Sequence, residues 1–328
     1  MTEGHRVDSL PQRLPGVYSK FATLINATLE QVLAEQEDTS AVWDAMRYTP
    51  LLGGKRLRPI LVCIAAEVAG RAGEDVVVAA CGTELAHSAS LILDDLPCMD
   101  GASERRWQPA SHLIYGEANA ILGSVSLIAL GFDLLARNAR SLGVDAAVAT
   151  AVVQRTGLGI REVAYGQALD LALQQGAHAT SHVLENCYWK KTGGVLSLSL
   201  SVGAQLAGAP STHVEALEAF GYELGVAFQL VDDLLDFHNG SSFSGKTAPA
   251  EEGRTYATIC GYEPTVDRAR EIAASARVHL SAIGEPAAPL SALVDAVIDD
   301  RLASILGAQQ QPARPSSPGI ALPKGVET

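Results

Sequence analysis

The sequence has few aromatic and few basic residues. Aromatic side chains make up only 5% of the 328 residues, although hydrophobic residues make up 48%. Lysine and arginine number 24 against 37 acidic residues, which gives a formal net charge of −13. This balance excludes a broad surface for nucleic acid or for an anionic membrane. An anionic ligand would therefore need a local cluster of cations or a bound metal ion.

Cysteine is scarce, and paired cysteine motifs are absent. The five cysteines are odd in number and include no CxxC pair, so we expect a reduced, cytoplasmic protein without structural zinc. The first residues are polar and lack the apolar core of a signal peptide. The apolar run 118–136 contains Asn119 and Asp133. We expect a buried helix there and no stable membrane insertion.

Strand-like alternation is also nearly absent, whereas helical periodicity recurs. Val17, Phe21, Ile25 and Leu29 fall on one face of a helical repeat, and later stretches repeat the pattern. Proline and glycine breakers between these stretches predict an all-α fold of about ten helices. We expect one domain over residues 15–307, between a flexible segment 1–14 and a disordered tail 308–328 that is rich in Pro, Gln and Ser.

Two aspartate clusters each follow an apolar helical run. The first reads SLILDDLPCMD over residues 90–100, and the second reads QLVDDLLD over residues 229–236. Like charges repel one another, and the carboxyl end of a helix disfavours anions, so the clusters are costly without cations. One such cluster would be a solvated helix end, but two of them predict metal binding. The predicted ligands are Asp94, Asp95, Asp100, Asp232, Asp233 and Asp236.

The chemistry of these ligands indicates the metal. All of them are oxygens, because Cys98 has no cysteine or histidine partner at zinc spacing. Oxygen ligands favour a hard cation, Mg²⁺ first and Mn²⁺ as a substitute. Pro97 is expected to end the first helix and to bring Asp100 back toward Asp94. Magnesium held by few carboxylates takes phosphate oxygens as further ligands, so a diphosphate is the expected ligand.

Basic residues gather at a few places. The segment GGKRLRP over residues 53–59 places three cations within four positions, after a flexible glycine pair. Lys55 and Arg58 are three positions apart and can converge on one anion, for which Arg58 offers a two-pronged guanidinium. The alternative for this segment alone is a basic surface turn. Further cations stand at 105–106, 190–191 and 246.

Together these motifs resemble those of the trans-isoprenyl diphosphate synthases, most closely the bacterial, carotenoid-pathway type of geranylgeranyl diphosphate synthase. The resemblance runs from about Pro50 to Leu306 and includes GQALDL at 166–171 and KTG at 191–193. It implies an all-α, homodimeric enzyme whose helices surround a deep central cavity. The implied substrates are isopentenyl diphosphate and an allylic diphosphate, namely the dimethylallyl, geranyl or farnesyl compound.

The resemblance also divides the cations between two anions. Lys55, Arg58 and His87, helped by Arg106, would bind the diphosphate of isopentenyl diphosphate. Without the resemblance, His87 would be equally compatible with a structural histidine whose hydrogen bonds are satisfied within a helix. Metal ions held by the aspartates would bind the allylic diphosphate and help it to leave.

Further residues would complete the allylic site. Arg105, Lys191 and Lys246 would surround the allylic diphosphate, and Thr192 and Gln229 would direct oxygens toward the forming carbocation. With the aspartates, these residues are the implied catalytic set. The motifs contain no obvious dedicated base, so the released diphosphate is the expected acceptor of the proton.

One departure from the family pattern and several alternatives remain. Trp107 stands where the family has glycine, and a glycine there can adopt a positive φ that tryptophan resists. This leaves open a weakly active enzyme or a non-catalytic partner subunit of a heteromeric synthase. A terpene cyclase of the same fold is disfavoured because Asp232, Asp233 and Asp236 form a second aspartate motif.

Product length depends on residues one turn before the first aspartate motif. Ala89 and Ser90, five and four positions before Asp94, are both small. In the family, an aromatic residue there commonly stops elongation at farnesyl diphosphate (C15). The small pair therefore predicts geranylgeranyl diphosphate (C20), with a C15 or C25 product as the alternatives.

Overall fold

The computed structural model describes residues 16–34, 40–239 and 255–309. Fourteen α-helices occupy this part of the chain. They are α2 (Gly16–Val32), α3 (Ala41–Leu51), α4 (Leu57–Val68), α5 (Val77–Asp94), α6 (Ser111–Tyr115), α7 (Glu117–Ser141), α8 (Ala146–Gln174), α9 (Ser181–Tyr188), α10 (Gly194–Leu206), α11 (Ser211–Asn239), α12 (Tyr256–Cys260), α13 (Tyr262–Ser281), α14 (Ala288–Val294) and α15 (Asp300–Gln309).

Short elements connect these helices. Two 3₁₀ turns, η1 (Gly73–Val76) and η3 (Glu285–Ala287), precede α5 and α14. Two π-helical turns, η2 (Trp189–Gly193) and η4 (Asp295–Asp299), lie between α9 and α10 and between α14 and α15. One antiparallel hairpin joins β1 (Glu104–Arg105) to β2 (Gln108–Pro109). The prediction of an all-α fold is therefore confirmed.

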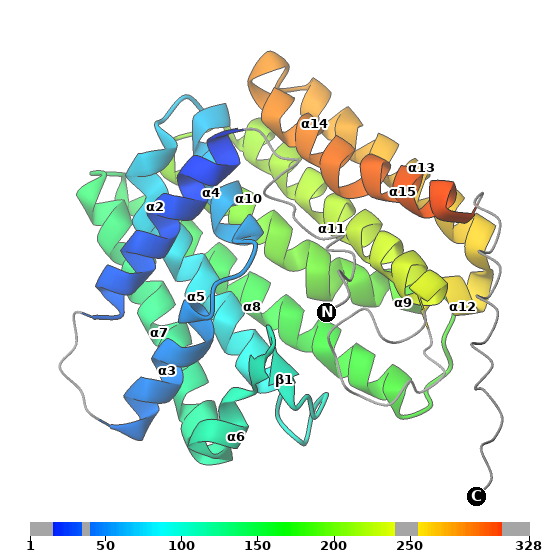
Figure 1. Ribbon diagram of the computed structural model, residues 1–328. Coiled ribbons are helices and arrows are strands. Elements are labelled where there is room, and N and C mark those ends of the chain that lie inside the picture. Colours follow the sequence, from blue (N-terminus) through cyan, green and yellow to red (C-terminus); the bar gives the residue numbers. More distant parts are fainter. Residues whose placement is uncertain (1–15, 35–39, 240–254, 310–328) are drawn as a thin grey trace, which may run out of the picture.

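The helices form one bundle. Figure 1 shows α5, α8, α10 and α11 in its middle, with α2, α3 and α7 on one side and α13, α14 and α15 on the other. The long helices pack in pairs, α5 against α7, α10 against α4 and α8, and α11 against α13. Both aspartate motifs belong to this central group. Helix α5 ends at the first motif, and α11 contains the second.

Apolar periodicity explains which helix faces are buried. Phe21, Ile25 and Leu29 of α2 are fully buried, as their spacing predicts. Helix α10 is apolar nearly all round and lies between α4, α8 and α11, so almost all of it is buried. Glycine allows the closest approach: a Cβ on Gly203 of α10 would overlap the carbonyl oxygen of Val62 in α4.

Two helical segments, 73–94 and 117–141, are long and apolar enough to cross a membrane. The most apolar windows of these segments are 67% and 44% buried inside the protein. Core helices of globular proteins give the same signal. The expected buried helix at 118–136 is thus α7, which packs one face on α5 and leaves another exposed.

The described part of the chain reaches the start of the expected tail. Helix α15 continues to Gln309, so the first two residues of the expected tail 308–328 are helical. Residues 1–14 and 310–328 lie outside the described part of the chain.

Candidate active site

The first aspartate motif lies where α5 ends. The helix stops at Asp94, and the chain then turns through Leu96 and Pro97. The backbone N–H of Asp100 donates to the carbonyl oxygen of Asp94 over 2.9 Å. The prediction that Pro97 returns Asp100 toward Asp94 is therefore confirmed. From α8, the side-chain amide of Gln167 donates to Asp100 over 3.4 Å and so ties that helix to the motif.

Asp95 has a different environment from its neighbours. Its side chain is buried, and the guanidinium of Arg105 forms a close ion pair with it. Arg105 Nε donates to both carboxylate oxygens over 3.1 Å. The predicted metal ligand Asp95 therefore serves, in this conformation, to hold Arg105 beside the motif. The predicted role of Arg105 at an allylic diphosphate is compatible with this position.

The second aspartate motif lies on α11. Asp232 is partly exposed and accepts a hydrogen bond from Arg301 Nη2 of α15 over 2.6 Å. The Arg301 guanidinium also lies 5.0 Å from the ring of Phe228, one turn earlier on α11. Asp236, one turn further along α11, is also partly exposed. Asp232 and Asp236 thus share one face of the helix, as the sequence predicts.

Asp233 points into the protein. Its Oδ2 accepts from the Tyr188 hydroxyl over 2.6 Å and from the backbone N–H of Tyr256 over 3.0 Å. Its Oδ1 accepts from Gln229 over 3.3 Å. Burial raises the pKa of Asp233 to about 7, although these three hydrogen bonds oppose the rise. The prediction that Asp233 binds metal disagrees with this placement, because Oδ2 is used to anchor α9 and α12 and Oδ1 accepts from Gln229 of α11 itself.

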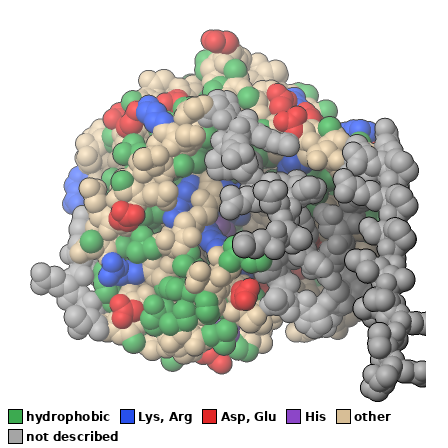
Figure 2. All heavy atoms as spheres, in the orientation of Figure 1, with side chains coloured by type: hydrophobic (Ala, Val, Ile, Leu, Met, Phe, Trp, Pro, Cys, Tyr) green, Lys and Arg blue, Asp and Glu red, His purple; other side chains and the backbone are tan. Residues whose placement is uncertain are grey.

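A cationic pocket lies beside the two motifs. Lys55, Arg58 and Arg106 line it together with His87 and Thr192, so residues far apart in the sequence meet there as predicted. Figure 2 shows lysine and arginine side chains gathered near the middle of one face, next to histidine atoms. The Nε of Arg58 is buried and has no hydrogen-bond partner within the described part of the chain. An orphaned buried donor of this kind suits an anionic ligand.

Arg56, the third cation of the GGKRLRP segment, also lines the pocket, but its guanidinium is bound by protein groups. It is buried and donates to Glu84 over 2.6 Å, to the carbonyl oxygen of Pro50 over 2.6 Å and to Asn26 over 2.8 Å. These bonds fix the segment between α3 and α4, with Arg56 itself at a φ of 51°. Arg56 thus has protein partners for its guanidinium, whereas the buried Nε of Arg58 has none among the described residues.

His87 stands between two cavities. It lines both the cationic pocket and a separate apolar cavity of about 260 Å³. Burial lowers the pKa of His87 well below its ordinary value, and the positive charges of Arg58, Arg106 and Arg105 lower it further. The imidazole is therefore neutral at neutral pH when no anion is bound.

The apolar cavity extends from the first aspartate motif. Asp94 and Met99 lie at one part of it, and the remaining walls come from α5, α7, α8 and α10, for example Ile128, Val163 and Leu198. Ser90 lines this cavity, as predicted for a residue that sets product length. Ala89 is fully buried and is not among the residues that line the cavity. The structure thus supports Ser90 and not Ala89 in that position.

Lys191 and Thr192 lie on the π-helical turn η2 and complete the site from the side of α8. Lys191 Nζ donates to Asp170 of α8 over 2.6 Å. Burial lowers the pKa of Lys191, but the negative charges of Asp170 and Asp94 outweigh it, so the pKa is raised. Thr192 contacts Gln229 of α11 over 3.4 Å. The turn therefore connects α8 to α11, the helix that carries the second aspartate motif.

The carboxylates of the two motifs fit a divalent cation that binds both to the protein and to the phosphate oxygens of a substrate. Among the described residues, no three Asp, Glu, His or Cys side chains converge on one point. Asp94 and Asp100 on one side, and Asp232 on the other, supply few oxygens each. That arrangement suits magnesium, which retains several waters and completes its coordination with phosphate oxygens.

Some residues of the site were missed at the level of sequence, and one cannot be placed. Lys246 lies outside the described residues. Gln167, Asp170, Glu84 and Arg301 were not predicted, although the first two stand in the GQALDL segment that the resemblance includes. Arg301 had no signal in the sequence, because it reaches Asp232 from 69 positions away.

The hairpin after the first motif confirms the concern about Trp107. Arg105 pairs with Gln108, so Arg106 and Trp107 form a two-residue loop. Their φ angles are 55° and 65°, as a tight hairpin turn requires. Trp107 therefore adopts the left-handed conformation that glycine would accept more readily, and its side chain is 82% exposed.

Comparison with known proteins agrees with this geometry. Residues 40–269 match the family model described as polyprenyl synthetase. The chain is 33% identical to the chloroplastic geranylgeranyl pyrophosphate synthase of Capsicum annuum over 301 residues, which cover 89% of this chain and 81% of the relative. It is 34% identical to the heterodimeric geranylgeranyl pyrophosphate synthase large subunit 2 of Arabidopsis thaliana, with 85% and 75% covered.

Solved structures show the same architecture. A geranyltransferase from Legionella pneumophila superposes with a TM-score of 0.76 at 28% identity, covering 92% of this chain and all of the other. A geranylgeranyl pyrophosphate synthetase from the archaeon Geoglobus acetivorans gives a TM-score of 0.76 at 27% identity, covering 86% and 99%.

Proposed function

Because this chain belongs to the polyprenyl synthetase family, we propose that it produces geranylgeranyl diphosphate from isopentenyl diphosphate and an allylic diphosphate. It is a short-chain trans-prenyl diphosphate synthase, that is, a prenyltransferase of isoprenoid biosynthesis. The product assignment rests on where His87 and Ser90 lie: both line the apolar cavity, and His87 also lines the cationic pocket. An apolar cavity begins directly beside the aspartate motif and the cationic pocket, and Ser90 leaves it unobstructed.

Asp94, Asp100 and Asp232 are the carboxylates best placed to hold metal, and Mg²⁺ is the proposed ion. When bound, it would stabilise the negative charge that develops on the departing allylic diphosphate. Lys191 and Arg105 lie where they can add positive charge to the same anion. Such preorganised charges favour breaking of the allylic C1–O bond, because they stabilise the leaving group without reorganising.

The cationic pocket holds the second substrate. Arg58, Lys55 and Arg106 would bind the diphosphate of isopentenyl diphosphate and keep its double bond close to the allylic carbon. Thr192 and Gln229 are in contact between the two sites and place oxygens near the forming carbocation. After the new C–C bond forms, a proton leaves, and the released diphosphate is the proposed acceptor.

The direct test incubates the purified protein with isopentenyl diphosphate, Mg²⁺ and each of the dimethylallyl, geranyl and farnesyl primers. We expect geranylgeranyl diphosphate as the main product. Ser90→Phe should shorten it toward farnesyl diphosphate, because the ring would fill the start of the cavity. Ala89→Phe is the comparison, since this side chain packs in the core and should lower stability instead. A wild-type product of C15 or C25 would refute the assignment.

A second test concerns the two aspartate motifs. Asp94→Ala and Asp232→Ala should each lower kcat by orders of magnitude while the protein stays folded, because neither change removes core packing. Circular dichroism checks the fold, and the rate is measured at saturating substrate and metal. Near-normal rates in either variant would show that two motifs are not needed.

We also propose that the protein is a homodimer. The proposed contact surface consists of exposed apolar side chains of α7 and α8, namely Ile121, Leu122, Val125, Val153 and Leu158. The Arabidopsis relative that is named a heterodimeric large subunit keeps a heteromeric assembly as the second candidate. The bacterial carotenoid-pathway type rests on the motifs, and a cytoplasmic location is supported by five free cysteines.

A further inference from the structure

An aromatic stack lies behind the turn that carries Lys191 and Thr192. The rings of Trp189 and Tyr222 are parallel within 4°, and their centroids are 4.5 Å apart. Trp189 opens the π-helical turn η2, and Tyr222 belongs to α11. Single π-helical turns occur often at functional sites because they redirect side chains within a helix. The stack therefore joins this turn to the helix that bears the second aspartate motif.

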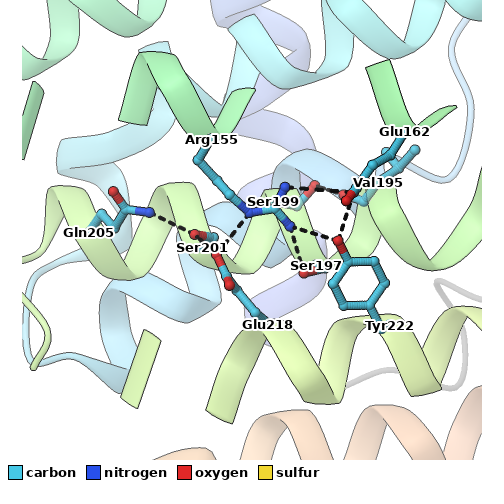
Figure 3. Close-up of polar contacts among 9 residues, drawn as sticks. All are labelled: Arg155, Glu162, Val195, Ser197, Ser199, Ser201, Gln205, Glu218 and Tyr222. Atoms are coloured by element: carbon cyan, nitrogen blue, oxygen red, sulfur yellow. Dashed lines mark hydrogen bonds and ion pairs between the residues drawn. The ribbon is translucent and has the colours of Figure 1, made fainter. Parts of the chain in front are cut away.

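Helix α8 fixes the far edge of the Tyr222 ring. The Tyr222 hydroxyl donates to Glu162 Oε2 over 2.7 Å and accepts from Arg155 Nη2 over 3.3 Å, as Figure 3 shows. Burial, together with the hydrogen bond to Glu162, raises the pKa of Tyr222 to about 12. The phenol thus keeps its proton at neutral pH and remains a donor to Glu162.

Arg155 is itself held firmly. Its Nε donates to Glu218 over 2.8 Å, and its Nη2 donates to Ser197 over 2.9 Å. Ser201 donates to the same oxygen of Glu218 over 2.6 Å. These contacts come from α8, α10 and α11, and Figure 3 shows them converging around the guanidinium. A network with partners on three helices leaves the Tyr222 ring few alternative positions.

The backbone around η2 is tightly packed. A Cβ on Gly166 of α8 would lie 2.6 Å from the backbone nitrogen of Lys191. A Cβ on Gly193 would lie 2.7 Å from the carbonyl oxygen of Tyr222. The turn thus lies directly between α8 and α11. On the remaining side of the turn, the Trp189 ring is 40% exposed and is covered on one face by Tyr222.

We propose that Trp189 and Tyr222 are positioning residues, whose stack orients the turn so that Lys191 faces the allylic diphosphate and Thr192 faces the forming carbocation. The proposal rests on the proposed function, which places Lys191 at that anion. Trp189 does not touch the cationic pocket or the apolar cavity, so its effect reaches the substrate only through the turn.

The first experiment compares Trp189→Ala with Trp189→Phe in the full-length protein. Without the stack, we expect the KM for the allylic diphosphate to rise about 10-fold and kcat to fall about 10-fold. The KM for isopentenyl diphosphate should change less, within about twofold, because Lys55, Arg58 and Arg106 of the cationic pocket lie outside the turn and only Thr192 belongs to it. Trp189→Phe keeps a ring for stacking and should retain most of the activity. Equal effects on both substrates, with loss of structure by circular dichroism, would overturn the proposal.

The second experiment tests whether the two rings act together. Tyr222→Leu removes the stack and the hydroxyl, whereas Tyr222→Phe removes only the hydroxyl and is the matched control. If the rings form one device, the Trp189→Ala/Tyr222→Leu double variant should be scarcely worse than either single variant. Fully additive losses would show that the rings act separately.

Lys191→Ala distinguishes this inference from the proposed function. If Lys191→Ala leaves the allylic KM unchanged, the placement of Lys191 at that substrate is wrong. If Lys191→Ala raises the allylic KM but Trp189→Ala does not, only the positioning role is wrong. Isothermal titration with farnesyl diphosphate and Mg²⁺, without the second substrate, measures allylic binding in each variant independently of turnover.

Discussion

His87 illustrates how neighbours decide the charge of a residue. Its side chain lies between the cationic pocket and the apolar cavity, with Arg58, Arg106, Arg105 and Arg56 as the charged groups that act on it. Burial and these positive charges favour the neutral imidazole. In the ligand-free protein, His87 therefore acts as a hydrogen-bonding group and adds no charge to the pocket.

This environment predicts a pH dependence of stability. Because the pKa of His87 is lower in the folded protein than in the unfolded chain, the unfolded chain takes up a proton first as the pH falls. Its contribution to stability is thus present above its ordinary pKa and lost below it. Between about pH 7.5 and about pH 5.5, the wild-type protein should lose up to about 1.4 kcal/mol more unfolding free energy than His87→Gln. Urea unfolding measures the difference, and equal losses would contradict it.

Trp107 offers a second prediction for a single residue. Trp107→Gly should raise the free energy of unfolding by up to about 1 kcal/mol, because glycine accepts a φ of 65° without steric cost. The exposed indole contributes little packing to offset this gain. Trp107→Ala is the control, since alanine keeps the strain and should bring no gain. Thermal unfolding followed by circular dichroism compares the three proteins, and a less stable glycine variant would show that the indole has a partner.

The identity of the site residues was predictable, but their orientations were not. The pattern of aspartates and cations indicated a metal-dependent diphosphate enzyme from residue types and spacing alone. It could not separate Arg58 from Arg56, because the protein partners of Arg56 depend on a left-handed φ and on Glu84, a residue 28 positions away. The inward orientation of Asp233 was not predictable for the same reason, since Tyr188 and Tyr256 bind it only in the folded chain.

At the scale of helices, close packing around α10 determines how the cavity walls meet. Gly203 lies against Val62 of α4, and Gly221 of α11 lies against Ser197. Gly203→Ala should lower the free energy of unfolding by about 1 to 3 kcal/mol, because a methyl group there forces α4 and α10 apart. Gly157→Ala adds the same methyl to α8 where no atom lies within 4 Å, and it should be neutral or stabilising. Chemical denaturation separates the two, and equal effects would contradict the packing argument.

Helix positions followed from apolar spacing and from breakers, and this is why the fold class was predictable. The face of α2 and the end of α5 before Pro97 are examples. The π-helical turn η4 had no local signal of this kind: its two ends, Asp295 and Asp299, both bond to Arg277 of α13, the first over 2.5 Å. Pairing between distant helices has no local signal.

At the scale of the whole molecule, α7 and α8 expose several large apolar side chains. Leu122 and Val125 of α7 are 53% and 59% exposed. Large apolar side chains that gather on neighbouring exposed helices commonly mark an interface. A second copy of the chain is the proposed occupant, through the same surface on both subunits.

Val125→Asp should weaken such a dimer, because it would bury a charge at the contact. The expected result is a rise of at least about 10-fold in the dimer dissociation constant. Analytical ultracentrifugation gives the constant, and Val278→Asp is the matched control, because Val278 is 67% exposed on α13, away from α7. A wild-type monomer, or equal dissociation in both variants, would exclude this interface.

The ion pair between Arg301 and Asp232 has a consequence for the order in which the site forms during translation. Its two partners are separated by 69 positions, and Arg301 belongs to the final described helix. During translation, α11 and its aspartates leave the ribosome well before α15 does. The second motif therefore acquires this arginine only after the 69 positions that separate the two partners have been synthesised, and a nascent chain or a truncated product that stops before residue 300 carries an aspartate motif without it.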